Sequence, residues 1–198
     1  AVANLLKKAG HHVTGSDHIL FPPASELLEH LKIKAHTGFA QENIAASSAD
    51  LFVIGNSISR GNVELEYILE NNLPYTSFPE LLHKYFLKNH CPVVICGTHG
   101  KTTTTSLLAH LLTELKCNPS FFIGGAPFNF PYSSHLGEKN SFFLLEGDEY
   151  DTVFYDKRSK FLHYCPQFLI INNLEFDHAD IFESLDDIDQ TFAKLIEL

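Results

Sequence analysis

The sequence predicts an α/β fold whose two domains each contain a mostly parallel sheet. Short apolar runs of strand length alternate with segments of helical periodicity, which is the pattern of βα units. The clearest example is the apolar run at residues 93–96, which passes through a glycine-containing turn into a helix start at Lys101. No internal repeat or low-complexity stretch interrupts this alternation. We expect two globular domains, residues 1–90 and residues 91–198.

The N-terminal domain is predicted to be Rossmann-like and to lack its first strand. Residues 4–9 have the pattern of the last turns of a helix, which Gly10 ends, and residues 11–17 are the next strand candidate. A doubly wound unit normally opens with a strand and a glycine-rich turn before that helix, so we expect an incomplete unit. Further helices are expected at residues 24–31 and 63–71, with strands at residues 33–36 and 50–55.

The boundary between the domains is predicted near residue 90. Ser77-Phe-Pro-Glu80 has the form of a capping box with a proline near the first turn, which predicts a helix to about Leu87. Residues 88–92 interrupt this helix, and the strand that follows opens the second domain.

The second domain begins with the parts of a phosphate-binding loop. After the strand come Gly97, Thr98, His99 and Gly100, and then Lys101, Thr102 and Thr103 start a helix. Glycines let backbone N–H groups approach phosphate oxygens, lysine supplies a charge, and the Thr102 hydroxyl is a ligand type for Mg²⁺. The general pattern has a glycine where Ile95 stands, and a plain glycine turn is the alternative, although it leaves the Lys-Thr-Thr start unexplained. We expect ATP or GTP at residues 97–103, in a P-loop ATPase domain.

The helix after this loop is expected at residues 101–115. Its N-terminus would direct free N–H groups and the positive end of the helix dipole at phosphate. Five leucines recur at helical spacing and are expected to form one face packed on the core: Leu107, Leu108, Leu111, Leu112 and Leu115.

Acidic residues follow the next predicted strand, residues 142–145. Glu146 stands at its end, where a phosphate-loop protein needs a carboxylate to hold Mg²⁺ directly or through water. Asp148, Glu149 and Asp151 lie in the same turn, and such crowding favours a bound cation or raised pKa values. Glu146 is the candidate ligand, a solvated strand-end carboxylate is the alternative, and the sequence does not decide which carboxylate touches metal.

A third strand of this domain is expected at residues 168–171, followed by Asn172 and Asn173 and then by Asp177 and His178. An asparagine amide or neutral imidazole beside the phosphates could complete a second Mg²⁺ site, although histidine is an unusual ligand for so hard a cation. A helix is expected at residues 186–198.

Two groups of polar residues follow strands in the first domain. Ser16 and Asp17 end one strand, and Asn56, Ser57 and Arg60 lie in the turn after another. Doubly wound sheets bind ligands at the carboxyl ends of their strands, so these are ligand candidates. The alternative is that Asp17 and Asn56 are turn residues or helix caps.

Composition limits the possible partners and compartments. The net charge of −10 argues against a broad nucleic-acid surface, and the apolar runs are too short to span a membrane. Cys91, Cys96, Cys117 and Cys165 lack C-x-x-C spacing, so we expect reduced, mostly buried thiols in a cytoplasmic protein, with a zinc site on them as the less favoured alternative. Residues 157–160, Lys-Arg-Ser-Lys, are the one basic cluster, and a solvated charged face is the favoured interpretation.

The loop Gly-Thr-His-Gly-Lys-Thr-Thr, the Glu-Gly-Asp-Glu-Tyr-Asp segment at 146–151 and the segment 172–180 together resemble the Mur ligase family. The resemblance implies Lys101, Glu146 and His178 as catalytic residues, with ATP at the loop and Asn173, and Mg²⁺ at Thr102, Glu146 and His178. It also implies that the UDP part of UDP-N-acetylmuramate lies against Ser16, Asp17, Asn56, Ser57 and Arg60, and that His99 contacts the muramoyl end.

Residues 151–164 resemble the branch of the family that joins UDP-N-acetylmuramate to the murein tripeptide L-Ala-γ-D-Glu-meso-diaminopimelate in peptidoglycan recycling, whereas the L-alanine-adding branch has a shorter segment there. The resemblance implies ATP-driven amide synthesis through an acyl phosphate. It also implies that the rest of the central domain and a C-terminal ligase domain lie outside this chain, which by itself is expected to be inactive. The alternatives are the L-alanine-adding reaction, another phosphate-loop ligase such as a folylpolyglutamate synthetase, and a non-catalytic nucleotide-binding module. The oligomeric state is left open.

Overall fold

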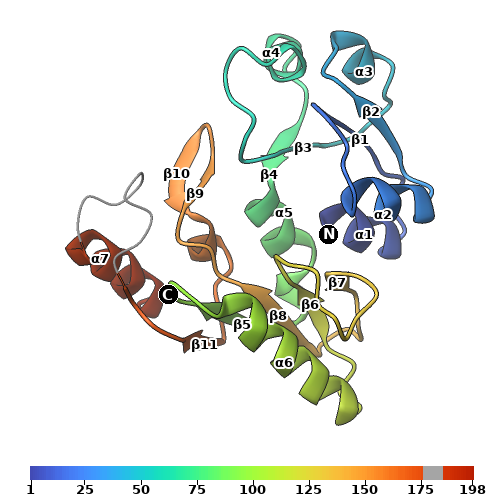
Figure 1. Cartoon of the computed structure of the whole chain (residues 1–198). Helices are drawn as coiled ribbons and strands as arrows, with labels where there is room; N and C mark the ends of the chain where they lie inside the picture. Colours follow the sequence, from blue (N-terminus) through green and yellow to red (C-terminus); the bar gives the residue numbers. More distant parts are fainter. Residues whose placement is uncertain (176–184) are drawn as a thin grey trace. The chain divides into compact units, whose positions relative to one another are not determined.

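The computed structural model describes residues 1–175 and 185–198 and shows a mixed α/β protein with mostly parallel sheets (Figure 1). The chain forms two compact units. One unit consists of Val2–Phe78 and Val153–Tyr155, and the other of Ala1, Pro79–Thr152 and Asp156–Leu198. The division predicted at residues 90 and 91 stays a prediction.

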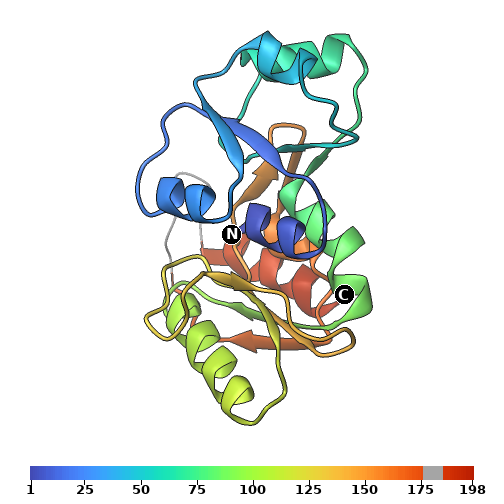
Figure 2. The same ribbon diagram turned by 90° about the vertical axis from the view of Figure 1, so that its right-hand side faces the viewer.

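The first unit contains two pairs of parallel strands. β1 (Thr14–Asp17) pairs with β2 (Lys34–Thr37), and β3 (Phe52–Ile54) pairs with β4 (Tyr75–Ser77). Its helices are α1 (Val2–Lys8), α2 (Ala24–His30), α3 (Gln41–Ala45) and α4 (Val63–Glu70), and α3 and α4 lie side by side (Figures 1 and 2). Ile54, Leu65, Ile68 and Val153 form a buried core cluster between β3 and α4. The expected strands and helices are therefore present, and α3 and β4 are additions.

The second unit is built on a five-stranded sheet with the order β11-β5-β8-β6-β7. Its strands are β5 (Cys91–Cys96), β6 (Ser120–Phe122), β7 (Ser134–His135), β8 (Phe142–Glu146) and β11 (Phe168–Ile171). Only the short edge strand β7 is antiparallel to its neighbour among the pairings of this sheet. β9 (Asp151–Val153) and β10 (Asp156–Ser159) form a separate two-stranded sheet.

The second unit also contains helices before, between and after the strands of this sheet. α5 (Phe78–Tyr85) and the 3₁₀ helix η1 (Leu87–Asn89) precede β5, so the helix predicted to about Leu87 ends two residues earlier and continues as a 3₁₀ turn. α6 (Lys101–Glu114) runs along the sheet beside β5 and β8 (Figure 1). The 3₁₀ helix η2 (Lys160–His163) follows β10, and α7 (Leu185–Ile196) is the last element.

The predicted leucine face of α6 is confirmed at two positions and wrong at three. Leu107, Leu111 and Leu115 are 55%, 49% and 70% exposed, whereas Leu108 and Leu112 pack against the core cluster. The fully buried positions of the helix are Thr105 and Ala109. Small side chains there let the helix backbone approach the sheet closely, which turns the 107-111-115 row away from the core.

Two further expectations need correction. Among the four cysteines, which are all free, Cys96 is buried, Cys91 and Cys117 are partly exposed and Cys165 is exposed, so the thiols are not mostly buried. The basic cluster is also not simply a solvated face, because Ser159 is buried and the Lys160 side chain is only 12% exposed. Within the described residues, no helix is long and apolar enough to cross a membrane.

Candidate nucleotide and metal site

The loop between β5 and α6 has the conformation that its glycines permit. Gly97 has φ +124° and Gly100, the N-cap of α6, has φ +79°, both in the region that side chains disfavour. A Cβ atom on Gly97 would lie 2.7 Å from the carbonyl oxygen of Asn173. Gly97 is therefore required both by its backbone conformation and by the close approach of the segment after β11.

Lys101 is held at the start of α6 by backbone and carboxylate partners. Its ammonium group donates to the carbonyl of Gly97 at 2.7 Å and lies 3.2 Å from Glu149 Oε2. The side chains of Lys101 and Glu149 are only 14% and 5% exposed. Lys101 and Glu149 therefore form a largely buried ion pair beside the loop. The sequence placed Glu149 in the acidic turn but did not predict that it pairs with Lys101.

Thr102 and Glu146 meet across the sheet edge. Glu146 ends β8, opposite Ile95 of the parallel strand β5, so the carboxyl ends of both strands lie together. The Thr102 hydroxyl donates to Glu146 Oε2 at 2.9 Å, and the Gly124 N–H donates to Oε1 at 2.7 Å. Burial is the main cause that raises the pKa of Glu146 above its ordinary value, and these two hydrogen bonds act in the opposite direction.

The loop after β6 was not predicted to contribute. Besides the Gly124 contact, a Cβ on Gly125 would lie 3.0 Å from Thr102 Cγ2, which shows how closely this loop approaches the site. The sequence signal was available, since a glycine pair after the apolar run at 121–123 marks a tight loop after a strand.

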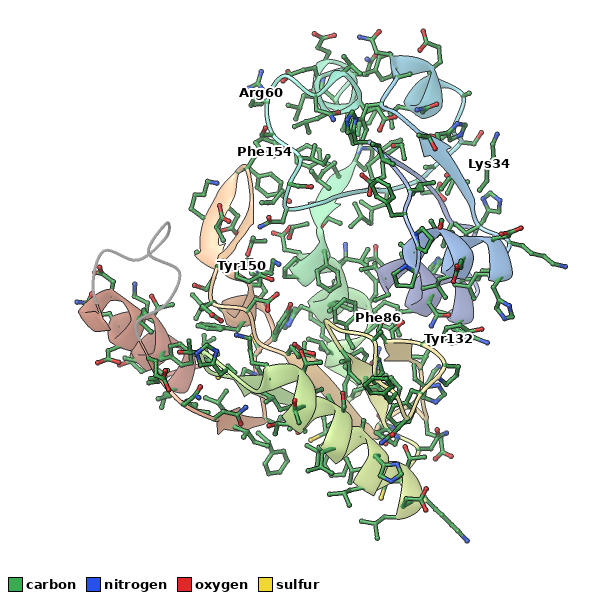
Figure 3. The ribbon with its side chains drawn as sticks, in the orientation of Figure 1. Lys34, Arg60, Phe86, Tyr132, Tyr150 and Phe154 are labelled. Atoms are coloured by element: carbon green, nitrogen blue, oxygen red, sulfur yellow. The ribbon has the colours of Figure 1, made fainter. Side chains whose placement is uncertain are left out.

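The other carboxylates of the acidic turn have partners of their own. Asp148 lies 3.2 Å from the Lys160 ammonium, which also lies 3.9 Å from the centre of the Tyr150 ring. Figure 3 shows Tyr150 where the chain enters the β9 and β10 hairpin. Burial first, and then the charge of Asp148, raises the pKa of Tyr150 far above its ordinary value, so the phenol stays neutral. Asp151 is paired with Lys157 at 2.6 Å on the surface.

The segment after β11 is joined to the phosphate-binding loop by several hydrogen bonds. The His99 N–H donates to the side-chain oxygen of Asn173 at 2.9 Å, and the Thr98 N–H donates to the Asn173 carbonyl at 3.1 Å. The Asn172 side chain donates to the His99 carbonyl at 3.2 Å. The structure thus brings Asn173 to the loop, as a neighbour of the expected nucleotide site.

Two other candidates, His99 and Thr103, have exposed side chains. The His99 ring is exposed and lies 3.8 Å from Glu175, a contact that counts as an ion pair only when the imidazole is protonated. Thr103 is exposed on the first turn of α6. His178 and Asp177 lie outside the described residues, so the expected second metal site stays a prediction.

In the first unit, Ser16 and Asp17 end β1 and their side chains have local partners. The Ser16 hydroxyl donates to the carboxylate of Glu64, which is buried and also accepts from Asn43 Nδ2 at 2.7 Å and from the Ala40 N–H at 3.2 Å. Asp17 accepts from the N–H of His18 at 2.7 Å, the kind of contact that a turn residue makes. Glu64 therefore holds the strand end in place.

The second group precedes α4. Asn56 and Ser57 are exposed, and Arg60 forms a two-point ion pair with Glu66, at 2.8 Å and 3.0 Å. Figure 3 shows Arg60 on the loop that leads into α4. Since Arg60 is 69% exposed, this pair is open to solvent and its arginine can exchange Glu66 for a ligand anion at small cost. Both candidate groups thus contact α4, through Glu64 and Glu66.

Comparison with known proteins identifies relatives along the whole chain. Residues 1–90 match the catalytic domain of the Mur ligase family, and residues 95–198 match the Mur ligase middle domain. The chain is 47% identical over 197 residues to the UDP-N-acetylmuramate--L-alanyl-gamma-D-glutamyl-meso-2,6-diaminoheptandioate ligase of Escherichia coli K12, covering 100% of this chain and 43% of that protein. It is 32% identical to the UDP-N-acetylmuramate--L-alanine ligase of Clostridium acetobutylicum, covering 100% of this chain and 41% of that protein. The chain thus spans less than half the length of these curated relatives.

Solved structures agree with these matches. The UDP-N-acetylmuramate:L-alanyl-gamma-D-glutamyl-meso-diaminopimelate ligase from Neisseria meningitides superimposes with a TM-score of 0.93 at 44% identity, covering 99% of this chain and 63% of that one. The UDP-N-acetylmuramate-alanine ligase of Thermotoga maritima superimposes with a TM-score of 0.80 at 25% identity, covering 98% of this chain and 43% of that one. This chain belongs to the Mur ligase family.

Proposed function

We propose that the protein carrying this chain is an ATP-dependent ligase that joins UDP-N-acetylmuramate to the tripeptide L-Ala-γ-D-Glu-meso-diaminopimelate in peptidoglycan recycling. The observation that carries the proposal is the 47% identity along the chain to the E. coli ligase whose name states this reaction, against 32% to an L-alanine ligase. The arrangement of Lys101, Thr102 and the buried Glu146 beside the glycine loop supports the proposal, because such a ligase needs a cation and a metal ligand next to the phosphates.

The geometry fits a magnesium ion between Thr102 and Glu146. Two neighbouring ligands of octahedral Mg²⁺, each about 2.0–2.1 Å from the ion, lie about 2.9 Å apart. The Thr102 hydroxyl and Glu146 Oε2 are already 2.9 Å apart. A magnesium ion could therefore bind both oxygens with little movement of either, and the hydrogen bond between them would be lost. Bound magnesium would also relieve the unfavourable burial of the Glu146 charge, which raises the pKa of that group.

Lys101 and the loop would bind and orient the triphosphate. Gly97 and Gly100 hold the backbone in conformations that expose N–H groups at the N-terminus of α6, where anions are stabilised. Lys101, which Glu149 and the Gly97 carbonyl now hold, would spread positive charge over the β- and γ-phosphates. When bound, ATP would supply the γ-phosphoryl group, which gives ADP and an acyl phosphate of the muramate carboxylate. The alanine amine of the tripeptide would then displace inorganic phosphate and form the amide. His178 is proposed for a second magnesium and Asn173 for the nucleotide side of the site.

The first unit is proposed to hold the UDP part of the substrate. Ser16 and Asp17 at the end of β1, with Asn56, Ser57 and Arg60 after β3, are the proposed contacts, and the exposed Arg60 is suited to a diphosphate because guanidinium binds phosphate through two hydrogen bonds. His99 is proposed to contact the muramoyl end. We expect a cytoplasmic enzyme, which the four free cysteines also favour.

The test uses the complete gene product. ADP release is measured with UDP-N-acetylmuramate and Mg²⁺, with the tripeptide or with free L-alanine as acceptor. Turnover that requires the tripeptide supports the proposal, and turnover with L-alanine alone assigns the biosynthetic reaction instead. ATP binding without ADP formation under both conditions would point to a nucleotide-binding module. The buried Glu146 argues against that alternative. Burying a carboxylate costs solvation free energy, and a module that only binds phosphate has little need of one beside the loop.

A further inference from the structure

A second group of metal-ligand side chains lies away from the phosphate-binding loop. Glu80 on α5, Asp156 at the start of β10 and His163 at the end of η2 place one ligand atom each within 4.8 Å of one another. This is the one such group of three or more among the residues that the structure describes. Asp156 and His163 both belong to the segment 151–164, which contains β9, β10 and η2.

His163 carries the observation that points to a ligand. Its side chain is 7% exposed, and its Nε2 atom is buried and makes no hydrogen bond with any group in the described part of the chain. The atom lies 3.2 Å from Asp156 Oδ2, but without the direction of a hydrogen bond. A buried imidazole nitrogen without a partner costs free energy, because it has lost its hydrogen bonds to water. A metal ion that binds the lone pair of this nitrogen would be such a partner.

The distances suit a transition-metal ion. Nitrogen and oxygen ligands about 2.0–2.2 Å from Zn²⁺ in a tetrahedral site lie about 3.3–3.6 Å apart. His163 Nε2 and Asp156 Oδ2 are 3.2 Å apart, which is close to this value. The largest separation in the group is at most 4.8 Å, so a movement of the Glu80 carboxylate by little more than 1 Å would bring all three ligand atoms to zinc-binding distances.

We propose that Glu80, Asp156 and His163 form a binding site for a borderline divalent ion such as Zn²⁺, distinct from the magnesium site at Thr102 and Glu146. One imidazole with two carboxylates favours zinc over magnesium, which prefers oxygen ligands alone. The imidazole would bind the ion through the lone pair of the buried Nε2 atom.

Arg158 takes the place of the cation in this structure. Its guanidinium donates to both oxygens of Asp156, at 2.7 Å and 3.0 Å, while 64% of its side chain is exposed. Because the side chain reaches in from solvent, it can leave as the ion enters. Arg158 and the metal therefore compete for Asp156, and removing the arginine charge should strengthen metal binding.

This competition gives the test its direction. Metal-free complete protein is titrated with Zn²⁺ against a chromophoric chelator in excess Mg²⁺, and with Co²⁺, whose visible absorption reports nitrogen and oxygen ligation. We expect one equivalent bound, weakened at least about tenfold by Glu80→Gln and by His163→Ala, and tightened several-fold by Arg158→Gln. His110→Ala, a histidine on α6 outside the group, and Glu146→Gln at the magnesium site are the matched controls and should bind as the unchanged protein does.

Several results would overturn the site. These are no binding by the unchanged protein, binding that Glu80→Gln and His163→Ala leave intact, loss of binding in Glu146→Gln, and weaker binding in Arg158→Gln. The last variant keeps the three ligands, so it decides the matter even when substitution of the buried histidine prevents folding.

Discussion

Replacing Lys101 by methionine should reduce stability as well as activity. In the folded protein the ammonium group lies 3.2 Å from Glu149 Oε2, and the carboxylate side chain is 5% exposed. At that distance, an effective dielectric constant of about 20 gives an attraction of about 5 kcal/mol, and removal of one member of such a buried pair typically costs about 3–5 kcal/mol. For a domain of this size, each kcal/mol lowers the melting temperature by about 2–4 °C, so Lys101→Met should lower it by about 6–12 °C even at the smaller cost.

The double variant Lys101→Met/Glu149→Gln separates charge pairing from packing. It removes both charges, so most of the lost stability should return, while ADP formation should stay about 100- to 1,000-fold below that of the unchanged enzyme because no cation meets the phosphates. Differential scanning fluorimetry and a coupled ADP assay on the complete gene product measure both effects. Equal melting temperatures for the unchanged protein and Lys101→Met, or no recovery in the double variant, would refute the reasoning from the buried pair. Unchanged turnover in Lys101→Met would refute the role of the lysine.

Three more predictions concern the same site. Glu146→Gln should raise the melting temperature of the nucleotide-free protein near neutral pH, because a carboxylate whose pKa is raised by burial destabilises the fold at pH values where it is ionised. This gain in melting temperature should shrink as the pH falls through the raised pKa. A gain that is constant at all pH values would contradict the reasoning. Gly97→Ala should cost at least about 1–3 kcal/mol from its φ of +124° alone, with a further cost from the 2.7 Å contact of its Cβ with Asn173, whereas Gly15→Ala, whose Cβ meets nothing within 4 Å, should leave the melting temperature nearly unchanged. Thr102→Val should abolish the strengthening of ADP binding by Mg²⁺ that calorimetry detects, while Thr102→Ser should retain it; equal behaviour of the two variants would exclude the hydroxyl as a ligand.

The parts of the site that the sequence predicted share one property, since each is local in the chain. A strand, a glycine turn and a Lys-Thr helix start occupy residues 93–103 and appear as β5, the loop and α6. Glu146 was placed correctly at a strand end because the apolar run at residues 142–145 predicts a strand that stops there. Since β8 pairs in parallel with β5, the carboxyl ends of the two strands lie at one edge of the sheet. Metal binding by Glu146 remains a prediction.

What sequence reasoning missed depends on contacts between distant segments. The Gly124 N–H reaches Glu146 from the loop after β6, and Glu149 pairs with Lys101 across 48 positions of the chain. The prediction for Leu107 and Leu111 of α6 was wrong for a related reason. Hydrophobicity alone makes these leucines better candidates for burial than Thr105 and Ala109. The sheet selects the smaller residues instead, since close packing rewards shape as well as apolar area.

The charges around the loop show what nucleotide binding must overcome. Lys101 is held by Glu149, Asp148 by Lys160, and Glu146 by the Thr102 hydroxyl and the Gly124 N–H. Since these groups already have partners within the chain, magnesium and the triphosphate would exchange partners rather than meet bare charges. The net gain is therefore a difference between large free-energy terms. We expect a divalent ion at Glu146 to contribute most to it, because burial raises the pKa of that carboxylate and the ion would offset the cost of its buried charge. Affinity for nucleotide should accordingly depend on Mg²⁺ more steeply than on the charge of any single side chain, and Glu146→Gln should remove that dependence while Lys101→Met leaves part of it.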